Sequence, residues 1–194
     1  MPELHITGDA TADRLLSDEP LALLIGMLLD QQVPMETAFA GPAKIKERLG
    51  GFDAATIADA DPEKFAEVFK QTPAVHRFPG SMAERTQALC AALVGDWGGD
   101  AERIWTDGDP DGATILKRLK ALPGFGEQKA KIFVALLGKQ YGVTPEGWRA
   151  AAGDYGKAGT YMSVADVVDQ GSLEKMLSYK KAAKAAAKAG AVGS

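Results

Sequence analysis

Cysteine and histidine are scarce in this sequence of 194 residues. Cys90 is the single cysteine, so the chain forms no internal disulfide and has too few ligands for a cysteine zinc site or an iron–sulfur cluster. The two histidines, His5 and His76, are too few for a histidine-rich metal site. We therefore expect a fold stabilised by its hydrophobic core, with no metal site and no required cofactor.

Long apolar runs are absent as well. No run reaches the roughly 18–20 residues of a membrane span, and the N-terminus lacks the pattern of a signal peptide. Hydrophobic residues make up 46% and charged residues 25%, as in ordinary soluble globular proteins. The length suits one domain or two small packed lobes. We expect a soluble cytoplasmic protein without a membrane partner.

Strand patterns are nearly absent, whereas helical periodicity recurs along the chain, so the predicted fold class is all-α. The run from Leu21 to Leu29 is almost wholly apolar and follows Pro20, which is typical of a buried helix. Ile115, Leu116, Leu119 and Leu122 form an apolar stripe at i, i+1, i+4 and i+7. Caps and breakers predict further helices. One spans 35–49 with an interruption at Gly41-Pro42, another spans 127–139, and a last one runs from Leu173 to about Lys188 after a Ser172 cap. Three more are expected to begin after Asp61, at the Ser81–Glu84 capping box and at Thr144-Pro145-Glu146.

The net charge of −4 conceals two basic stretches. Residues 117–131 carry four lysines and one arginine against one glutamate, and the part from Ser172 onward carries five lysines against one glutamate. A basic patch on an acidic chain indicates a polyanion partner, and the alternative is a solvated helix face. No apolar stripe continues past Tyr179, so we expect the Lys/Ala-rich tail to fray. Its charge either adds salt-sensitive affinity for nucleic acid or only keeps the protein soluble.

The segment Leu122–Ala130 carries the most informative motif. Two glycines one residue apart separate two predicted helices, an arrangement that aims several backbone N–H groups and the positive end of a helix dipole in one direction. Such a device binds a nucleic-acid backbone without reading its sequence, and the alternative is a plain tight turn. The candidate binding residues here are Pro123, Gly124, Phe125, Gly126, Gln128, Lys129 and Lys131.

The pattern Leu-Pro-Gly-x-Gly-x-x-x-Ala after an amphipathic helix resembles the helix-hairpin-helix of the HhH-GPD base-excision DNA glycosylases, the endonuclease III superfamily. Leu24–Gln32 is similar to that family's first core helix, and Gln32 matches the side chain that fills the gap left by an extruded nucleotide. Phe78–Ala83 resembles the family's loop with an apolar wedge, which places Phe78 at the wedge. The resemblance covers roughly residues 21–149.

The resemblance implies a bilobal, all-α HhH-GPD fold. A central lobe at 21–139 would contain the hairpin helices at about 114–139, residues 1–20 and 140–178 would form the second lobe, and 179–194 would be the tail. The implied partner is duplex DNA with a damaged or mispaired base that is flipped out, with nucleoid association when bound. The family also implies a monovalent cation bound by backbone carbonyls of the hairpin. No protein partner can be inferred.

The sequence departs from the family at the catalytic lysine and at the cluster. The matching position is Gln128, whose amide cannot form a Schiff base, so lyase chemistry through it is excluded. Lys129 lies about 100° further round the helix, and we do not expect it to substitute. No cysteine follows Cys90, so the family's iron–sulfur cluster is absent, and Cys90 itself is expected to be a buried small hydrophobe.

The position of the family's catalytic aspartate is ambiguous. Alignment on Val143 places Thr144 there, whereas counting from Gln128 places Glu146 there, and Asp154 is a third candidate. Only the carboxylates Glu146 and Asp154 suit the stabilisation of a cationic sugar. The alternative for Glu146 is an acid that compensates a helix dipole. Trp148 and Tyr155 either line a base pocket by stacking or belong to the core.

The leading hypothesis is a monofunctional DNA glycosylase of base-excision repair that hydrolyses an N-glycosidic bond, without β-lyase activity. The first alternative is a non-catalytic protein on the same fold that binds damaged or distorted DNA. The second is an all-α protein-interaction module in which the hairpin is only a turn.

Overall fold

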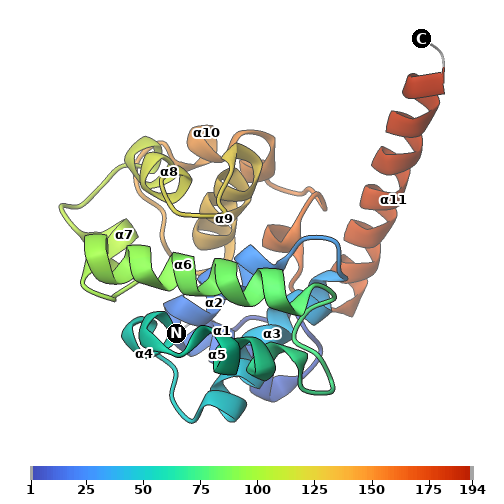
Figure 1. Ribbon diagram of the computed structural model, residues 1–194. Coiled ribbons are helices and arrows are strands. Elements are labelled where there is room, and N and C mark those ends of the chain that lie inside the picture. The colour runs from blue at the N-terminus through green and yellow to red at the C-terminus, as the bar shows by residue number, and fades with distance from the viewer. Residues whose placement is uncertain (1, 193–194) are drawn as a thin grey trace.

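The computed structural model describes residues 2–192, and all regular structure in that range is helical (Figure 1). This confirms the predicted all-α class. The described helices are α1 (Ala10–Asp18), α2 (Pro20–Leu29), α3 (Met35–Leu49), α4 (Ala54–Asp59), α5 (Pro62–Lys70), α6 (Pro79–Trp97), α7 (Arg103–Thr106), α8 (Gly112–Lys120), α9 (Glu127–Gln140), α10 (Trp148–Ala152) and α11 (Gln170–Val192), with 3-10 turns η1 (Gly153–Gly156) and η2 (Val164–Asp166).

Helix α2 forms the centre of the core. Pro20 occupies its first turn, and every residue from Leu21 to Leu29 is buried, as the apolar run predicts. The helix packs against α3 and α6. Cys90 on α6 is also fully buried, and burial raises the pKa of its thiol to about 12. Cys90 therefore acts as the small hydrophobe that the sequence predicts.

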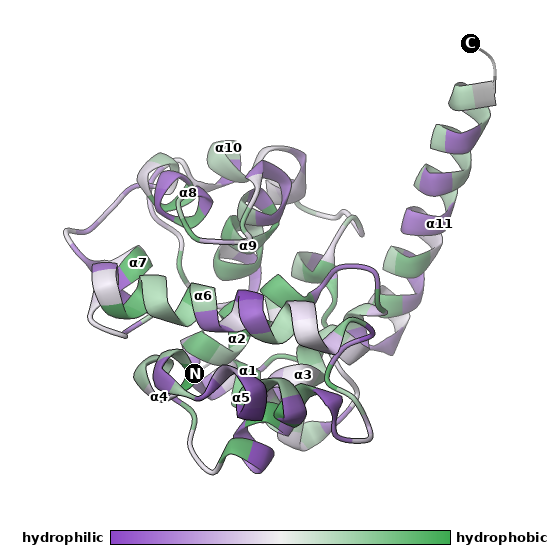
Figure 2. Ribbon diagram, viewed as in Figure 1, coloured by the Kyte–Doolittle hydropathy of each residue, from purple (hydrophilic) through white to green (hydrophobic). Residues whose placement is uncertain are grey.

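Helices α8, α9 and α10 pack on one another on one side of α6, and α1–α5 lie on its other side (Figure 1). The predicted lobe boundary near residue 139 stays a prediction. Helix α11 leaves the body of the molecule and projects from it, with hydrophilic residues recurring along the projecting part (Figure 2). Within residues 2–192, no helix combines the length and apolar character that a membrane crossing requires.

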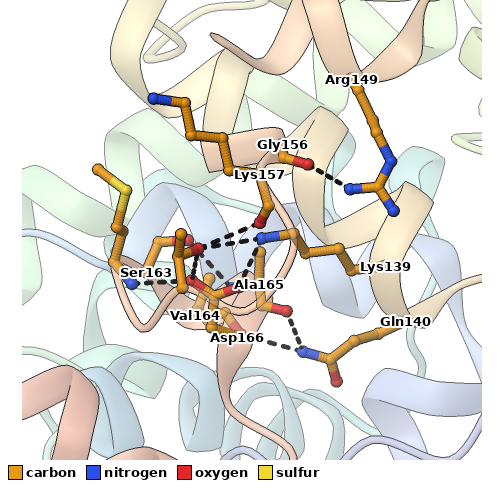
Figure 3. A network of polar contacts seen from close by, with 11 residues as sticks. Lys139, Gln140, Arg149, Gly156, Lys157, Ser163, Val164, Ala165 and Asp166 are labelled. Atoms are coloured by element: carbon orange, nitrogen blue, oxygen red, sulfur yellow. Dashed lines mark hydrogen bonds and ion pairs between the residues drawn. The ribbon is translucent and has the colours of Figure 1, made fainter. Parts of the chain in front are cut away.

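A polar network fastens the segment before α11 to α9 (Figure 3). Lys139 Nζ lies 2.6 Å from Asp166 Oδ1, and their side chains are only 12% and 5% exposed. The other oxygen of Asp166 accepts from Thr160 Oγ1 and from the backbone N–H of Met162. Gln140 Nε2 donates to the carbonyls of Val164 and Ala165. These contacts fix where the chain turns into α11.

Two predicted helix features differ in the first half of the chain. Helix α3 is continuous through Gly41 and Pro42, because tertiary packing buries both residues and offsets the missing proline N–H. Gly41 is needed there because a Cβ would meet the side chains of Leu29 and Val75. Helix α6 begins at Pro79 and not at Ser81, so the Ser81–Glu84 pair lies inside the helix and makes no capping box.

Helix boundaries near the C-terminus also differ from the predicted ones. Thr144 and Pro145 are not helical, because Gly147 adopts φ +75° and α10 begins only at Trp148. Helix α11 begins at Gln170, two residues before Ser172, and the side chain of Asp169 accepts from the Ser172 N–H. The helix also continues through Gly190 to Val192, past the end that the sequence predicts near Lys188.

Candidate nucleic-acid interface

The hairpin between α8 and α9 presents its backbone to solvent. Gly124 adopts φ +83°, and a Cβ there would overlap the side chain of Leu28 on α2. Gly126 is the N-cap of α9 and has no side-chain cap. Within the described chain, no acceptor engages the N–H groups of Gly124, Gly126, Glu127 or Gln128. Both glycines are exposed, so these amides and the positive end of α9 can face an anion.

The hairpin side chains differ from the expected binding set. The Phe125 side chain is buried, packed edge-on against Phe133, so it is part of the core. Lys129 Nζ donates to the carbonyl of Leu28 at 3.1 Å, which directs its charge into the molecule and away from a phosphate backbone. Lys131 lies 3.5 Å from Glu127 in an i, i+4 pair at the surface. Pro123 and Gln128 are exposed.

The two adjacent glutamines in the corner after α2 differ in their surroundings. Gln31 is held in place, since its Nε2 donates to the Leu28 carbonyl and its Oε1 accepts from Arg85. Gln32 adopts the left-handed φ of +59°, which is unusual for a residue with a side chain, and it is exposed. The backbone of this corner therefore projects Gln32, the side chain predicted to fill a gap in the duplex, toward solvent.

The predicted wedge lies beside this corner. The Phe78 side chain is 43% exposed, a high value for a large hydrophobic residue. His76 is buried and links the two loops: its Nδ1 accepts from the Phe78 N–H, which makes Nε2 the protonated nitrogen, and Nε2 lies 3.1 Å from the Leu29 carbonyl and 2.9 Å from that of Gln31. One histidine thus fixes the Gln32 corner relative to the Phe78 loop.

A cavity of about 350 Å³ lies where the hairpin, the α2 corner and α11 meet. This volume falls within the usual range for small-molecule sites. The residues lining the cavity are Met27, Asp30, Gln128, Lys129, Ile132, Tyr155, Met162, Tyr179, Lys180 and Ala183. Helix α11 therefore forms one wall, and the start of α9 forms another.

Asp30 is the carboxylate of this cavity, and the sequence reasoning missed it. It directly follows α2, and burial raises its pKa against the opposing effect of Lys180 and Lys129. Its side chain has no hydrogen bond within the described residues. The available signal was an acid placed directly after nine apolar residues, at the negative end of a helix dipole, where a carboxylate is unfavourable.

The start of α9 supplies two further polar side chains. Gln128 Nε2 donates to the Tyr155 hydroxyl at 2.9 Å, so Tyr155 lies in the cavity as expected for a pocket residue. Lys129 lines the same cavity, and burial lowers its pKa. The cavity therefore wraps around the first turn of α9, and the expectation that Lys129 does not take the place of a lysine at position 128 stays a prediction.

The remaining predicted site residues lie outside this cavity. Glu146 is exposed, and its carbonyl accepts from the Gly112 N–H at the start of α8. Asp154 is exposed and pairs with Lys157 at 2.8 Å, a contact that lowers the pKa of Asp154. Thr144 is also exposed. The Trp148 ring packs so closely on Gly138 that no Cβ would fit, so Trp148 is a packing residue of α9 and α10 and does not line the cavity.

A family model for the HhH-GPD superfamily base excision DNA repair proteins matches residues 25–191. The chain belongs to this superfamily. Comparison with curated proteins and with solved structures found no significant match. The match spans the α2 corner, the wedge loop, the hairpin and most of α11. All of the motifs described above are therefore those of a base excision repair protein whose substrate is DNA.

In this HhH-GPD protein, the hairpin, the α2 corner and the wedge loop come together at the end of α2. The hairpin contacts Leu28 through Gly124 and Lys129, the corner begins at Asp30, and His76 joins the wedge loop to the same turn. These segments are up to about 100 residues apart in sequence, and Lys129 and Leu28 are separated by 101. In this HhH-GPD protein, the end of α2 is therefore the structural centre of the candidate interface.

Proposed function

We propose that this protein is a monofunctional DNA glycosylase that hydrolyses the N-glycosidic bond of a damaged or mispaired base flipped from duplex DNA. The supporting observation is the convergence of an amide-presenting hairpin, an exposed Gln32 and an exposed Phe78 around one cavity with a carboxylate. An enzyme that acts on a base inside a duplex needs a grip on the backbone, a means of filling the gap, and a pocket. Cytoplasmic location with nucleoid association belongs to the same proposal.

In this proposal, the hairpin binds one phosphate strand through the amides of Gly124, Gly126 and Gln128. Hairpin carbonyls would hold a monovalent cation on the same strand. Gln32 fills the space of the extruded nucleotide, and Phe78 opens the stack beside it. Lys131 adds positive charge next to the hairpin. Because His76 fixes both loops to one turn, the two inserted side chains enter the duplex as a unit.

The proposed activity is hydrolysis without strand cleavage. Gln128 occupies the position of the family's Schiff-base lysine, and an amide nitrogen is not a nucleophile. Its side chain bonds to Tyr155 in the cavity, where the tyrosine ring offers a stacking surface for a base. The product we expect is therefore an intact strand with an abasic site.

The test is excision from labelled duplexes that contain uracil, an alkylated purine, an oxidised purine or a mismatch. We expect strand breaks for at least one duplex after alkali and none before it. Breaks without alkali would contradict the monofunctional assignment. The matched control is the same duplex without the lesion, which should remain intact.

The second candidate is a non-catalytic protein that binds damaged DNA, and one observation favours it. Neither carboxylate expected from the sequence, Glu146 or Asp154, lines the cavity. This candidate predicts tighter binding to a duplex with a tetrahydrofuran abasic analogue than to the intact duplex, with no excision from any lesion in the panel. Excision of any base contradicts it.

A further inference from the structure

We propose that Asp30 is the catalytic carboxylate of this protein, and this inference rests on the proposed glycosylase function. Asp30 lies on the cavity wall formed by the end of α2, opposite the α11 side chains Tyr179 and Lys180. It is the only carboxylate that lines this cavity within the described residues. A sugar whose base enters the cavity would therefore present its C1′ atom to Asp30 and to no other acid.

The local contacts place Asp30 at the junction of the DNA-binding motifs. Residues on both sides of it are fixed: before it, the carbonyls of Leu28 and Leu29 accept from Lys129 and His76, and after it, the Gln31 carbonyl accepts from His76. Its own N–H donates to the Met27 carbonyl at 3.3 Å. The backbone that carries Asp30 is thus held by the hairpin helix and by the wedge loop, which preorganises the carboxylate relative to bound DNA.

A structural role does not explain Asp30. The side chain forms no hydrogen bond and no ion pair within 4 Å among residues 2–192, and it lies at the negative end of the α2 dipole. Acids used for stability form ion pairs, cap helix N-termini or are exposed to solvent. Asp53 and Asp61, for example, cap the N-termini of α4 and α5. An unpaired, partly buried acid in a cavity indicates a chemical task.

The reaction requires a negative charge close to the sugar, and Asp30 supplies it. The C1′–N bond breaks, both of its electrons leave with the base, and the base takes up a proton from solvent. The negative charge of Asp30 stabilises the positive charge on the sugar ring. A water oxygen then bonds to C1′, and its proton passes to Asp30 and on to solvent. The net change is the addition of one water across the N-glycosidic bond.

The first experiment measures single-turnover excision for Asp30→Asn on the duplex that the wild type cleaves in the lesion panel. We expect a loss of about 10²–10⁴-fold in rate. Binding to the tetrahydrofuran duplex should remain, since the amide keeps the shape of the side chain. Asp59→Asn, which removes an exposed carboxylate of α4, is the matched control and should excise normally.

The second experiment separates catalysis from a structural role by pH. Because the pKa of Asp30 is raised above its ordinary 3.8, activity should fall as the pH drops through that raised value, and Asp30→Asn should lose this acidic limb. The charged form destabilises the folded state above that pKa, so Asp30→Asn should unfold at a higher temperature than the wild type at pH 7. The difference should vanish only below the ordinary value of 3.8, where Asp30 is protonated in both the folded and the unfolded chain.

The outcomes are distinguishable. If the wild type excises no base, the proposed function fails and the role of Asp30 fails with it. If the wild type is active and Asp30→Asn retains full rate, or if Glu146→Gln or Asp154→Asn alone abolishes excision, the assignment to Asp30 is overturned while the glycosylase remains. Should Asp30→Asn unfold, Asp30→Ser provides a smaller neutral replacement for the same rate comparison, and full activity of that variant likewise overturns the assignment.

Discussion

At the residue scale, charged side chains in this protein divide into buried partners and exposed ones. Lys139 and Asp166 form an ion pair that is almost fully removed from solvent, whereas Asp154 and Lys157 form a pair of similar length at the surface. Buried pairs are sensitive to the loss of one partner, because the remaining charge stays in a medium of low polarity. Exposed pairs contribute little.

We therefore expect Lys139→Met to destabilise the protein by about 3 kcal/mol, since it strands the Asp166 carboxylate. Urea unfolding followed by circular dichroism measures the change. Lys157→Met, which removes the exposed partner of Asp154, is the control and should leave the midpoint unchanged. Equal midpoints for both variants would mean that water reaches Asp166.

At the scale of elements, the hairpin offers two glycines with different tasks. Gly124→Ala forces a side chain into left-handed backbone and into Leu28, so it should destabilise the protein by about 1–3 kcal/mol and weaken DNA binding. Gly126 has φ −77° and open space around it, so Gly126→Ala should keep the stability of the wild type. Thermal unfolding and titration of a fluorescent duplex at low salt test both variants. Unchanged DNA affinity in Gly124→Ala would contradict the role of the hairpin.

The link between the corner and the wedge loop is a second element with a clear prediction. His76→Ala removes the donor to the Leu29 and Gln31 carbonyls and the acceptor of the Phe78 N–H, so we expect a loss of about 1–3 kcal/mol in stability. Preference for the abasic duplex over the intact one should fall as well. His5→Ala, at the exposed second histidine, is the matched control. A normal abasic preference in His76→Ala would show that the two loops act independently.

At the scale of the whole molecule, α11 extends the cationic surface beyond the cavity. Tyr179, Lys180 and Ala183 line the cavity, and Lys184 and Lys188 lie about one and two turns beyond Lys180 on α11, the helix that projects from the body in Figure 1. This supports the hypothesis that the tail contacts DNA, rather than serving solubility alone.

The double variant Lys184→Gln/Lys188→Gln should therefore reduce the salt dependence of DNA binding. Each phosphate contact contributes about 0.9 to the slope of log K against log salt, so the slope should decrease by about 1.8. Lys64→Gln/Lys70→Gln on α5 makes the same charge change away from the cavity and should not alter the slope. A slope equal to that of the wild type in both doubles would leave the tail a solubilising role only.

Local sequence patterns determined much of the fold. The apolar run of α2, the apolar stripe of α8 and the Pro-Gly-x-Gly hairpin could be predicted from the sequence, because each depends on residues within one or two helical turns. Helix starts at Ser81, Thr144 and Ser172 were misplaced, and so was the break at Pro42. At each of these positions, a neighbouring turn or buried packing outweighed the cap or breaker that the sequence offers.

The candidate site could be predicted only in part from the sequence. The sequence by itself determined the motif residues Gln32, Phe78, Gly124 and Gly126, together with the absence of a Schiff-base lysine at 128 and of iron–sulfur ligands. The tertiary structure alone decided that Phe125 and Trp148 pack internally, that Lys129 faces the cavity, and that Asp30 is its carboxylate. The reason is physical: a motif is defined by bonds along the chain, whereas a cavity is lined by side chains from α2, α9 and α11, whose meeting depends on long-range packing.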